Sequence, residues 1–329
     1  MRAGLLVAFA VAVSGLVAMP ATAQSPAADG VLHAGTAPAA TLRPHQRSGA
    51  EIYAEFRAGL AEPACPAGSA SPRWSRHFSA AAARLSEKDE TLALFGYVVD
   101  ALRESDLPTE YALIPFVESG YKPDARSTLG PAGLWQFIAM TARNHKVPIR
   151  DGFDGRLSPV ASTRAAVRYL KTLHGMFAGD WRLAAMAYNA GEYRLFGALR
   201  RSGQVARSAD HEKLVGLSGI TRAYPRKIHA ISCLLQAADD RGEWLAAVDR
   251  PVARLTEVAL PLEARDLDTW ARAQGLEPAR VRKLNPAFAH GRITRRGSEP
   301  LQALAPAVPA VQAVETVTIA DAEGATVPD

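Results

Sequence analysis

One glutamate, Glu118, stands in a stretch whose other residues are almost all apolar. Ile114, Phe116 and Val117 come directly before it, and Gly120 follows two positions later. Burial among apolar side chains disfavours the ionised form of a carboxylate and raises its pKa. A carboxyl group with a raised pKa can donate a proton near neutral pH, so this stretch predicts a general acid. The alternative is a solvated glutamate at the end of a core helix.

The residues before Glu118 predict a helix that ends at the acid. Pro108 suits a first helical turn, apolar residues recur at helical spacing over residues 109–117, and Gly120 is a natural terminator. Glu118 then lies in the last turn, where the negative end of the helix dipole also disfavours its charge. Pro115 removes one helical hydrogen bond, so we expect a kink just before the glutamate.

Three phrases follow one another along the chain: VESGYKPDARS (residues 117–127), GLWQF (133–137) and AYNAG (187–191). In this order they resemble the catalytic domain of soluble lytic transglycosylases, a lysozyme-like helical fold that cleaves peptidoglycan. PVASTRAAVRYLKTLH (159–174) and GDWRLAAMAYNAGE (179–192) are similar to the membrane-bound lytic transglycosylase D subfamily. Each phrase alone is a weak signal, but the ordered set is specific.

The resemblance assigns roles to six residues. It implies that Glu118 is catalytic and that five others bind substrate: Ser127, Gln136, Tyr188, Asn189 and Tyr224. Gln136 offers a donor and an acceptor, as recognition of sugar hydroxyl and acetamide groups requires. For Ser127 the alternative is a turn residue, and we expect Trp135 to pack in the core.

Tyr224 belongs to TRAYPRKIHAI (residues 221–231), which resembles the motif whose tyrosine closes the cleft opposite the acid. Pro225 follows Tyr224 directly, where the subfamily usually has an apolar residue before its proline. This departure affects where the helix begins, and we expect the helix itself from Lys227 to Ala238.

No second carboxylate stands out as a partner of Glu118, although glycosidases usually carry two. Asp124 lies in a loop, Asp151 and Asp154 in a glycine-rich turn, and Asp180 suits a helix cap. The resemblance implies substrate-assisted cleavage of the β-1,4 bond between N-acetylmuramic acid and N-acetylglucosamine. The 6-hydroxyl then attacks within the sugar and leaves a 1,6-anhydro end. A hydrolytic muramidase and a non-catalytic peptidoglycan-binding protein are the alternatives.

The N-terminus predicts a secretory signal peptide over residues 1–23. Arg2 precedes an apolar run (residues 5–19), and Ala21 and Ala23 form a cleavage pattern. A membrane anchor is the alternative, but the run is short for a bilayer. Position 24 is Gln24 rather than the cysteine that lipid attachment needs. We therefore expect a soluble periplasmic protein without an integral membrane segment in the mature chain.

Composition adds weak constraints on the protein's partners. The formal charge of +5 falls by one to +4 when Arg2 is removed with the signal, which is compatible with an anionic cell-wall polymer. No basic stripe interleaved with aromatic residues suggests nucleic acid. We expect peptidoglycan glycan strands as the partner and no cofactor, and the sequence identifies no protein partner.

The only two cysteines are Cys65 and Cys233. In an oxidising compartment they can form a disulfide, but a buried or free thiol is an equally open alternative. The eight histidines are scattered and form no spacing typical of a metal site, so we expect no metal.

The fold class predicted for the 329 residues is mainly α, with a small C-terminal α+β module. Residues 24–49 read as a flexible leader, and 50–248 as a lysozyme-like transglycosylase domain that opens with helices at 51–60 and two more over 73–107. Residues 302–329, rich in Ala, Pro and Val, predict a disordered tail.

The C-terminal module is expected at residues 251–301. A strand at 252–260 precedes helices at 266–276 and 277–288, and RITRRG from position 292 is a weak strand or loop. The order strand, helix, helix, strand resembles a degenerate LysM module, a fold that binds chains containing N-acetylglucosamine. Residues 265–269 replace its usual Gly-Asp-Thr-Leu opening, so a structural cap is the alternative.

Overall fold

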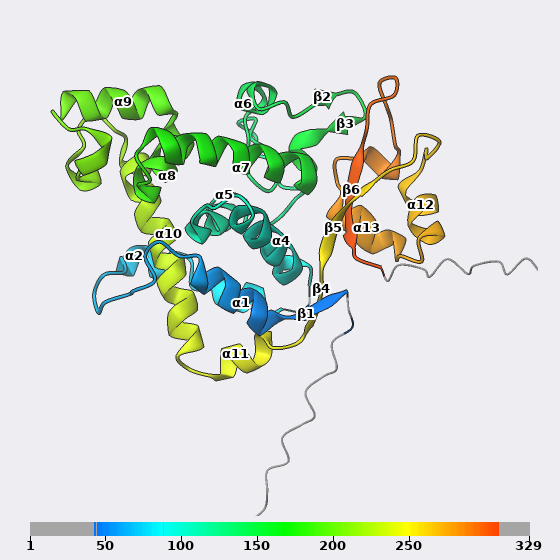
Figure 1. Ribbon diagram of the computed structural model, residues 1–329, viewed down its shortest axis with the longest axis horizontal. Helices are drawn as coiled ribbons and strands as arrows, with labels where there is room; N and C mark the ends of the chain where they lie inside the picture. The colour runs from blue at the N-terminus through cyan, green and yellow to red at the C-terminus, as the bar shows by residue number, and fades with distance from the viewer. Residues whose placement is uncertain (1–42, 44, 88, 309–329) are drawn as a thin grey trace, which may run out of the picture. The chain divides into compact units, whose positions relative to one another are not determined.

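A computed structural model describes residues 43, 45–87 and 89–308, and the protein in this range is mainly helical (Figure 1). The predicted signal peptide, most of the predicted leader and the tail beyond residue 308 lie outside the described residues. None of the helices that the structure describes is both long and apolar enough to cross a membrane. The α-helices are α1 (Gly49–Ala58), α2 (Pro72–His77), α3 (Ala81–Ser86), α4 (Thr91–Arg103), α5 (Ile114–Glu118), α6 (Ala139–Asn144), α7 (Pro159–Met176), α8 (Trp181–Ala190), α9 (Glu192–Arg201), α10 (Gly219–Asp239), α11 (Glu243–Val248), α12 (Leu267–Ala273) and α13 (Pro278–Leu284).

The strands are short and pair two by two. They are β1 (Gln46–Ser48), β2 (Ile149–Arg150), β3 (Phe153–Asp154), β4 (Pro251–Ala253), β5 (Leu255–Ala259) and β6 (Gln302–Pro306). The antiparallel pairs are β1 with β4, β2 with β3, and β5 with β6. The described fold therefore consists mainly of helices. The pairs β1–β4 and β5–β6 join segments that are far apart in the sequence, whereas β2 and β3 pair locally.

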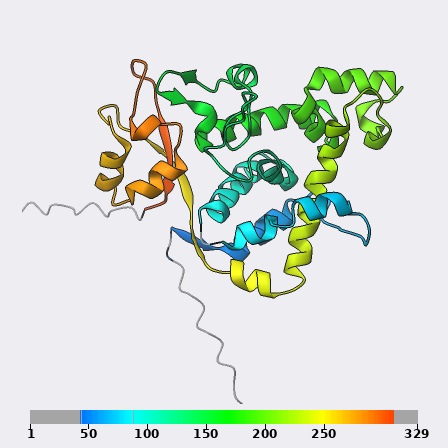
Figure 2. The ribbon, with the colours of Figure 1, turned by 180° about the vertical axis from the view of Figure 1, so that it is seen from behind.

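Helix α4 is the centre of the hydrophobic core. Every residue of 91–99 is buried, which is expected of a helix that is apolar on all sides. It contacts α1, α3 and α7, and Figures 1 and 2 show it between α1 and α7. This packing supports η1 (Thr109–Leu113), the short 3₁₀ segment that precedes α5 and also contacts α4.

Capping residues define the ends of helices α7 and α8. The hydroxyl of Ser158 accepts the backbone N–H of Ala161 at the start of α7, and Asp180 caps α8 through the N–H groups of Arg182 and Leu183. Gly191 ends α8 with a φ of +89°, a conformation that favours glycine. These caps fix the direction in which the end of α8 points.

Two predictions about the N-terminal region are wrong. The described residues of 73–107 form three helices, not two, because a turn at residues 78–80 and bends at residues 87, 89 and 90 interrupt the apolar pattern. The predicted leader extends to residue 49, yet β1 is paired with β4 within it. Arg47 holds this strand in place, since its buried guanidinium bonds to Glu55 and Asp100 at 2.8 Å each.

The C-terminal module keeps the predicted strand, helix, helix, strand order but with other boundaries. The single strand expected at 252–260 is two strands, β4 and β5, which pair with different partners. The segment at 292–297 is not a strand. The last strand is β6, so the boundary of a disordered tail at residue 302 is wrong. Its middle residues 303–305 are buried, and Asn285 exchanges two hydrogen bonds of 2.7 Å with the backbone of Leu304.

Candidate active site

Glu118 is the last residue of α5, as predicted, and is half-buried. The expected kink occurs as a change of helix type, because the 3₁₀ segment η1 ends at Leu113 and α5 begins at the next residue. Pro115 lies in the first turn of α5, where its missing N–H leaves no helical bond unmade. The carboxylate of Glu118 therefore projects from the C-terminal end of a short helix.

The turn after the acid connects it to the GLWQ segment. The N–H groups of Ser119 and Tyr121 both donate to the carbonyl of Pro115, at 3.0 and 3.1 Å. The hydroxyl of Ser119 donates to the carbonyl of Leu134 at 2.9 Å. Sequence reasoning missed this positioning role of Ser119, and a hydroxyl residue directly after the acid was its only local signal.

The environment of Glu118 raises the pKa of its carboxyl group. Burial is the largest cause. Two groups oppose it by favouring the charged form: the hydroxyl of Tyr224, which donates to Oε1 at 2.5 Å, and the positive charge of Lys227. The carboxyl group is thus inclined to hold a proton, yet two groups are in place to stabilise its anion.

Tyr224 reaches the acid from within α10. The helix begins at Gly219, where the hydroxyl of Ser218 accepts the N–H of Thr221, and it continues through Pro225. The prediction that this helix starts near Lys227 is therefore wrong, because the proline is tolerated inside it. Lys227, which the sequence analysis did not select, lies one helical turn after Tyr224 and faces the same acid.

Tyr188 lies close enough to Glu118 to be affected by its charge, and it is hydrogen-bonded to the backbone of Trp135. The hydroxyl of Tyr188 donates to the carbonyl of Trp135 at 2.8 Å, and the charge of Glu118 adds to burial in raising the pKa of Tyr188 well above its usual value. Trp135 is fully buried and donates from its indole N–H to Thr163 at 2.9 Å. Its predicted place in the core is confirmed.

Asn189 is exposed at the end of α8. Its Oδ1 accepts a hydrogen bond of 3.1 Å from the hydroxyl of Thr221, which lies in the first turn of α10. This bond links the two helices and orients the amide. Within the described part of the chain the amide NH₂ has no partner and is available to donate.

Gln136 and Ser127 lie in the loop between α5 and α6, and both bond within it. Nε2 of Gln136 donates to the carbonyls of Gly133 and Ala125, at 2.8 and 3.3 Å, so only its Oε1 remains available as an acceptor. The hydroxyl of Ser127 accepts the N–H of Leu129 at 3.2 Å. No hydrogen bond among the described residues joins Ser127 to the acid, and its geometry is that of a turn residue.

Gly133 and Arg156 give this loop its shape. Gly133 has a φ of +81°, and a Cβ there would lie 1.7 Å from the carbonyl oxygen of Arg156. Arg156 donates to the carbonyl of Gly130 at 2.7 Å and pairs with Asp154 at 2.8 Å. Only glycine fits at position 133. Asp154 pairs with Arg156, which in turn bonds to the loop, so this carboxylate helps to hold the loop.

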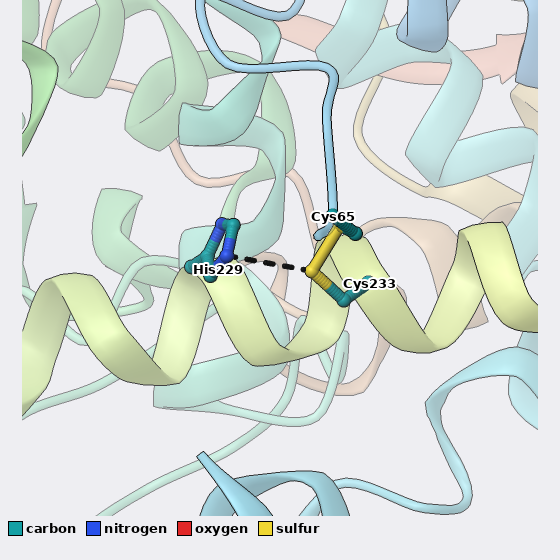
Figure 3. A group of neighbouring side chains, drawn as sticks. All are labelled: Cys65, His229 and Cys233. Atoms are coloured by element: carbon teal, nitrogen blue, oxygen red, sulfur yellow. Dashed lines mark hydrogen bonds between the residues drawn. A yellow bond between two sulfur atoms is a disulfide. The ribbon is translucent and has the colours of Figure 1, made fainter. Parts of the chain in front are cut away.

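Cys65 and Cys233 form a disulfide, with their Cα atoms 5.6 Å apart (Figure 3). This answers the question that the sequence left open. Nε2 of His229 lies 3.5 Å from the sulfur of Cys233, so a histidine and two cysteines come together. Both sulfur atoms are bonded to each other and are not thiolate ligands in this state.

The part of the chain that carries most of these residues is similar to known proteins. The sequence pattern of the Transglycosylase SLT domain matches residues 99–211. Membrane-bound lytic murein transglycosylase D of Escherichia coli (strain K12) is 32% identical over 191 residues, which are 57% of this chain and 41% of that protein. Peptidoglycan transglycosylase gp16 of Escherichia phage T7 is 42% identical over 83 residues, 25% of this chain and 6% of that protein.

A structure of an inactive mutant of the lytic transglycosylase Slt from Pseudomonas aeruginosa aligns with 47% of this chain and 25% of its own, at 23% identity and a TM-score of 0.34. The chain spans less than half the length of each of these relatives. The matched range contains Glu118, the GLWQ segment and the AYNAG segment. The resemblance seen in the sequence is confirmed: residues 99–211 match the Transglycosylase SLT domain, and the chain is similar to lytic transglycosylases over this region.

Proposed function

We propose that this protein is a peptidoglycan lytic transglycosylase that uses Glu118 as both acid and base. The substrate is the β-1,4 bond between N-acetylmuramic acid and N-acetylglucosamine. The observation that carries the proposal is the setting of Glu118, a half-buried carboxyl group with a raised pKa whose Oε1 accepts the hydroxyl of Tyr224 at 2.5 Å. Such a group can donate a proton and then persist as an anion.

In the first step the protonated carboxyl group of Glu118 donates to the glycosidic oxygen, and the bond from that oxygen to C1 of the muramic acid breaks. Tyr224 occupies Oε1, which leaves Oε2 to carry the proton. The carbonyl oxygen of the sugar's own N-acetyl group donates an electron pair to C1 as positive charge develops there. The carboxylate that remains is stabilised by Tyr224 and by the charge of Lys227.

In the second step the carboxylate of Glu118 removes the proton of the C6 hydroxyl of the same sugar. The C6 oxygen bonds to C1 as the N-acetyl carbonyl leaves it, and a 1,6-anhydro end results. The acid is protonated again, and no water is consumed. The raised pKa of Glu118 serves both steps, because the group must be protonated at the start and basic afterwards.

The carboxylates around the site support this single-acid chemistry. Asp154 pairs with Arg156, Asp180 caps α8, and Glu192 accepts the hydroxyl of Tyr169 at 3.0 Å. Each therefore has a structural partner, and Lys227 is the charge that acts on Glu118. A base across the scissile bond is what a water-using glycosidase needs. Hydrolysis by a muramidase is the alternative, and the product distinguishes it.

Five residues are proposed to bind the glycan. Asn189 offers its free amide NH₂, Gln136 its Oε1, and Tyr188 and Tyr224 border the acid. Ser127 is the weakest of the five, because its hydroxyl is engaged in a turn. We place the mature protein in the periplasm, on the basis of the signal peptide that residues 1–23 resemble.

The C-terminal module is proposed to act chiefly as a structural cap with a LysM-like topology. Its strand, helix, helix, strand order supports the topology. Its contacts with the catalytic domain support the cap: Arg280 bonds to Glu90 at 2.6 Å, and Phe288 packs on Phe153 with ring centroids 5.1 Å apart. Glycan binding by the separate surface of this module is the alternative function.

The products released from purified sacculi test the proposal. Mass spectrometry distinguishes 1,6-anhydromuramic ends from reducing ends, because hydrolysis adds one water. We expect anhydro ends only. Reducing ends would indicate a muramidase, and binding without any release would indicate a non-catalytic wall protein.

A further inference from the structure

A pocket of about 690 Å³ lies beside α10, between the start of this helix and α2. We call it the basic pocket. The side chains that give it its character are Arg73, Trp74, Ile220, Arg226 and Lys227. Figures 1 and 2 show α2 lying against α10, which fits the contacts between them. None of these residues belongs to the matched range 99–211.

The charged side chains that line the basic pocket are all positive. Arg226 is paired with Glu212 at 2.9 Å. Arg73 and Lys227 have no ion pair with any described residue. Both lie over the indole ring of Trp74, with the guanidinium carbon 4.7 Å and the ammonium nitrogen 4.9 Å from its centroid. Two cations without an ion pair among the described residues therefore lie within 5 Å of the centre of one half-buried aromatic ring.

The two cations disfavour each other. Burial lowers the pKa of Lys227, and the charge of Arg73 lowers it further, while Glu118 opposes both effects. A negatively charged group bound near both cations offsets this repulsion. The pocket is thus electrostatically prepared for an anion that also has an apolar part, since Ile220 is 65% exposed at its rim.

The basic pocket shares one residue, Lys227, with the surroundings of Glu118. Lys227 lies one helical turn after Tyr224, and its charge acts on Glu118. The opposite wall is held covalently, because the disulfide between Cys65 and Cys233 fixes the segment before α2 to α10 (Figure 3). A ligand in the pocket would therefore contact Lys227, the residue whose charge acts on the acid, and the disulfide limits how far the segment before α2 can move from α10.

From this geometry we propose that the basic pocket binds the carboxylates of a peptide stem carried by the glycan strand. The inference rests on the proposed substrate, peptidoglycan, whose stems carry free carboxylates next to aliphatic side chains. The carboxylates of such stems match the two cations, and their aliphatic side chains match the apolar rim. The protein then acts faster on glycan strands that bear stems than on strands from which stems have been removed.

The test compares three substrates prepared from one batch of soluble, uncross-linked glycan strands. The first keeps its stems, the second is stripped by an amidase that cuts between the sugar and the peptide, and the third keeps stems whose carboxylates have been converted to amides. We expect the wild-type kcat/KM to be about 10-fold higher on the first than on the other two, and the difference to shrink in high salt. Equal rates on all three would overturn the inference.

Arg73→Gln is the informative variant, because it removes one of the two unpaired cations. We expect KM for the stem-bearing strands to rise about 5-fold, with kcat and the rate on stripped strands unchanged. Arg76→Gln is the matched control, since Arg76 is exposed on the same helix and outside the pocket. A loss that is equal on all substrates, or equal in both variants, would contradict the proposal.

Binding by the Glu118→Gln variant separates this inference from the proposed chemistry. Fluorescence anisotropy with labelled strands measures affinity without turnover. Tighter binding of stem-bearing strands, with no anhydro product from the wild type, would support the pocket and reject the reaction. Anhydro product from the wild type, together with equal affinities for all three strands, would support the reaction and reject the pocket.

Discussion

The hydroxyl of Tyr224 donates a 2.5 Å hydrogen bond to Oε1 of Glu118, although the two residues are 106 positions apart in the sequence. The bond joins α5 to α10 at the point where the chemistry is proposed to occur. It stabilises the anion of a carboxyl group whose pKa is raised by burial. The hydroxyl of Tyr224 is therefore hydrogen-bonded directly to the acid and favours its charged form.

Tyr224→Phe tests this bond. Without the hydroxyl, the anion of Glu118 loses a charge-assisted hydrogen bond of about 1.5–3 kcal/mol, so we expect kcat to fall about 10-fold to 100-fold. The pKa of Glu118 rises further, and the alkaline limb of the pH–rate profile moves to higher pH. Tyr97→Phe is the control. The hydroxyl of Tyr97 also donates to a carboxylate, at 2.6 Å, but that carboxylate belongs to Glu257, which is not a residue of the site. An unmoved profile in Tyr224→Phe would reject the role of the bond.

Glu110 predicts a pH dependence of stability. It is buried, and burial raises the pKa of its carboxyl group from 4.5 to about 7. The folded state binds this proton more tightly than the unfolded state. The stabilisation is therefore complete below pH 4.5 and is lost as the pH rises to about 7, by roughly 3 kcal/mol.

Glu110→Gln isolates that contribution, because the amide does not titrate. We expect the free energy of unfolding of the variant, relative to the wild type, to increase by roughly 3 kcal/mol between pH 4.5 and 8. Urea denaturation at several pH values measures the difference, in which the other titrating groups cancel. Parallel curves for the two proteins would show that Glu110 does not titrate in this range.

Gly133→Ala is expected to distort the loop that carries Gln136. The new Cβ would lie 1.7 Å from the carbonyl oxygen of Arg156, and the φ of +81° is unfavourable for alanine. We expect the free energy of unfolding to fall by about 2–4 kcal/mol, and the activity to be much lower. Gly203→Ala is the matched control, since its φ is +62° but nothing lies within 4 Å of the added atom. Equal losses in both variants would attribute the effect to φ alone.

The disulfide between Cys65 and Cys233 closes a segment of 168 residues. Loop-closure entropy of that size makes the oxidised protein about 3–5 kcal/mol more stable than the double Cys→Ser variant. Denaturant unfolding of the two proteins, and of the wild type with and without a reductant, measures the difference. A reductant that shifts the double variant as much as the wild type would exclude the disulfide as the cause.

Local chemistry explains which features the sequence predicts well. Proline and a glycine bracket the helix that ends at Glu118, and Ser158 and Asp180 cap α7 and α8, so each boundary depends on a few adjacent residues. The apolar setting of Glu118 likewise lies in its nearest neighbours. Such signals need no knowledge of the rest of the chain.

Long-range pairing explains most of what the sequence does not predict. The strand β6 is short and contains Ala and Pro, and its identity depends on pairing with β5 and on the amide of Asn285. β1 likewise depends on a partner about 200 residues later in the chain, which no local pattern contains. Lys227 acts on Glu118 from a helix more than 100 residues later in the chain, so its side chain carries no local sign of that role, and Ser119 carries only its position directly after the acid.

The central claim is that Glu118 alone performs acid and base chemistry and yields a 1,6-anhydro product. The most direct measurement compares wild type with Glu118→Gln on purified sacculi, by mass spectrometry of the released muropeptides and by circular dichroism of both proteins. We predict anhydro-ended fragments from the wild type, and from the variant a native spectrum with release reduced at least about 10³-fold. Substantial release by a folded Glu118→Gln variant, or reducing ends from the wild type, would contradict the account.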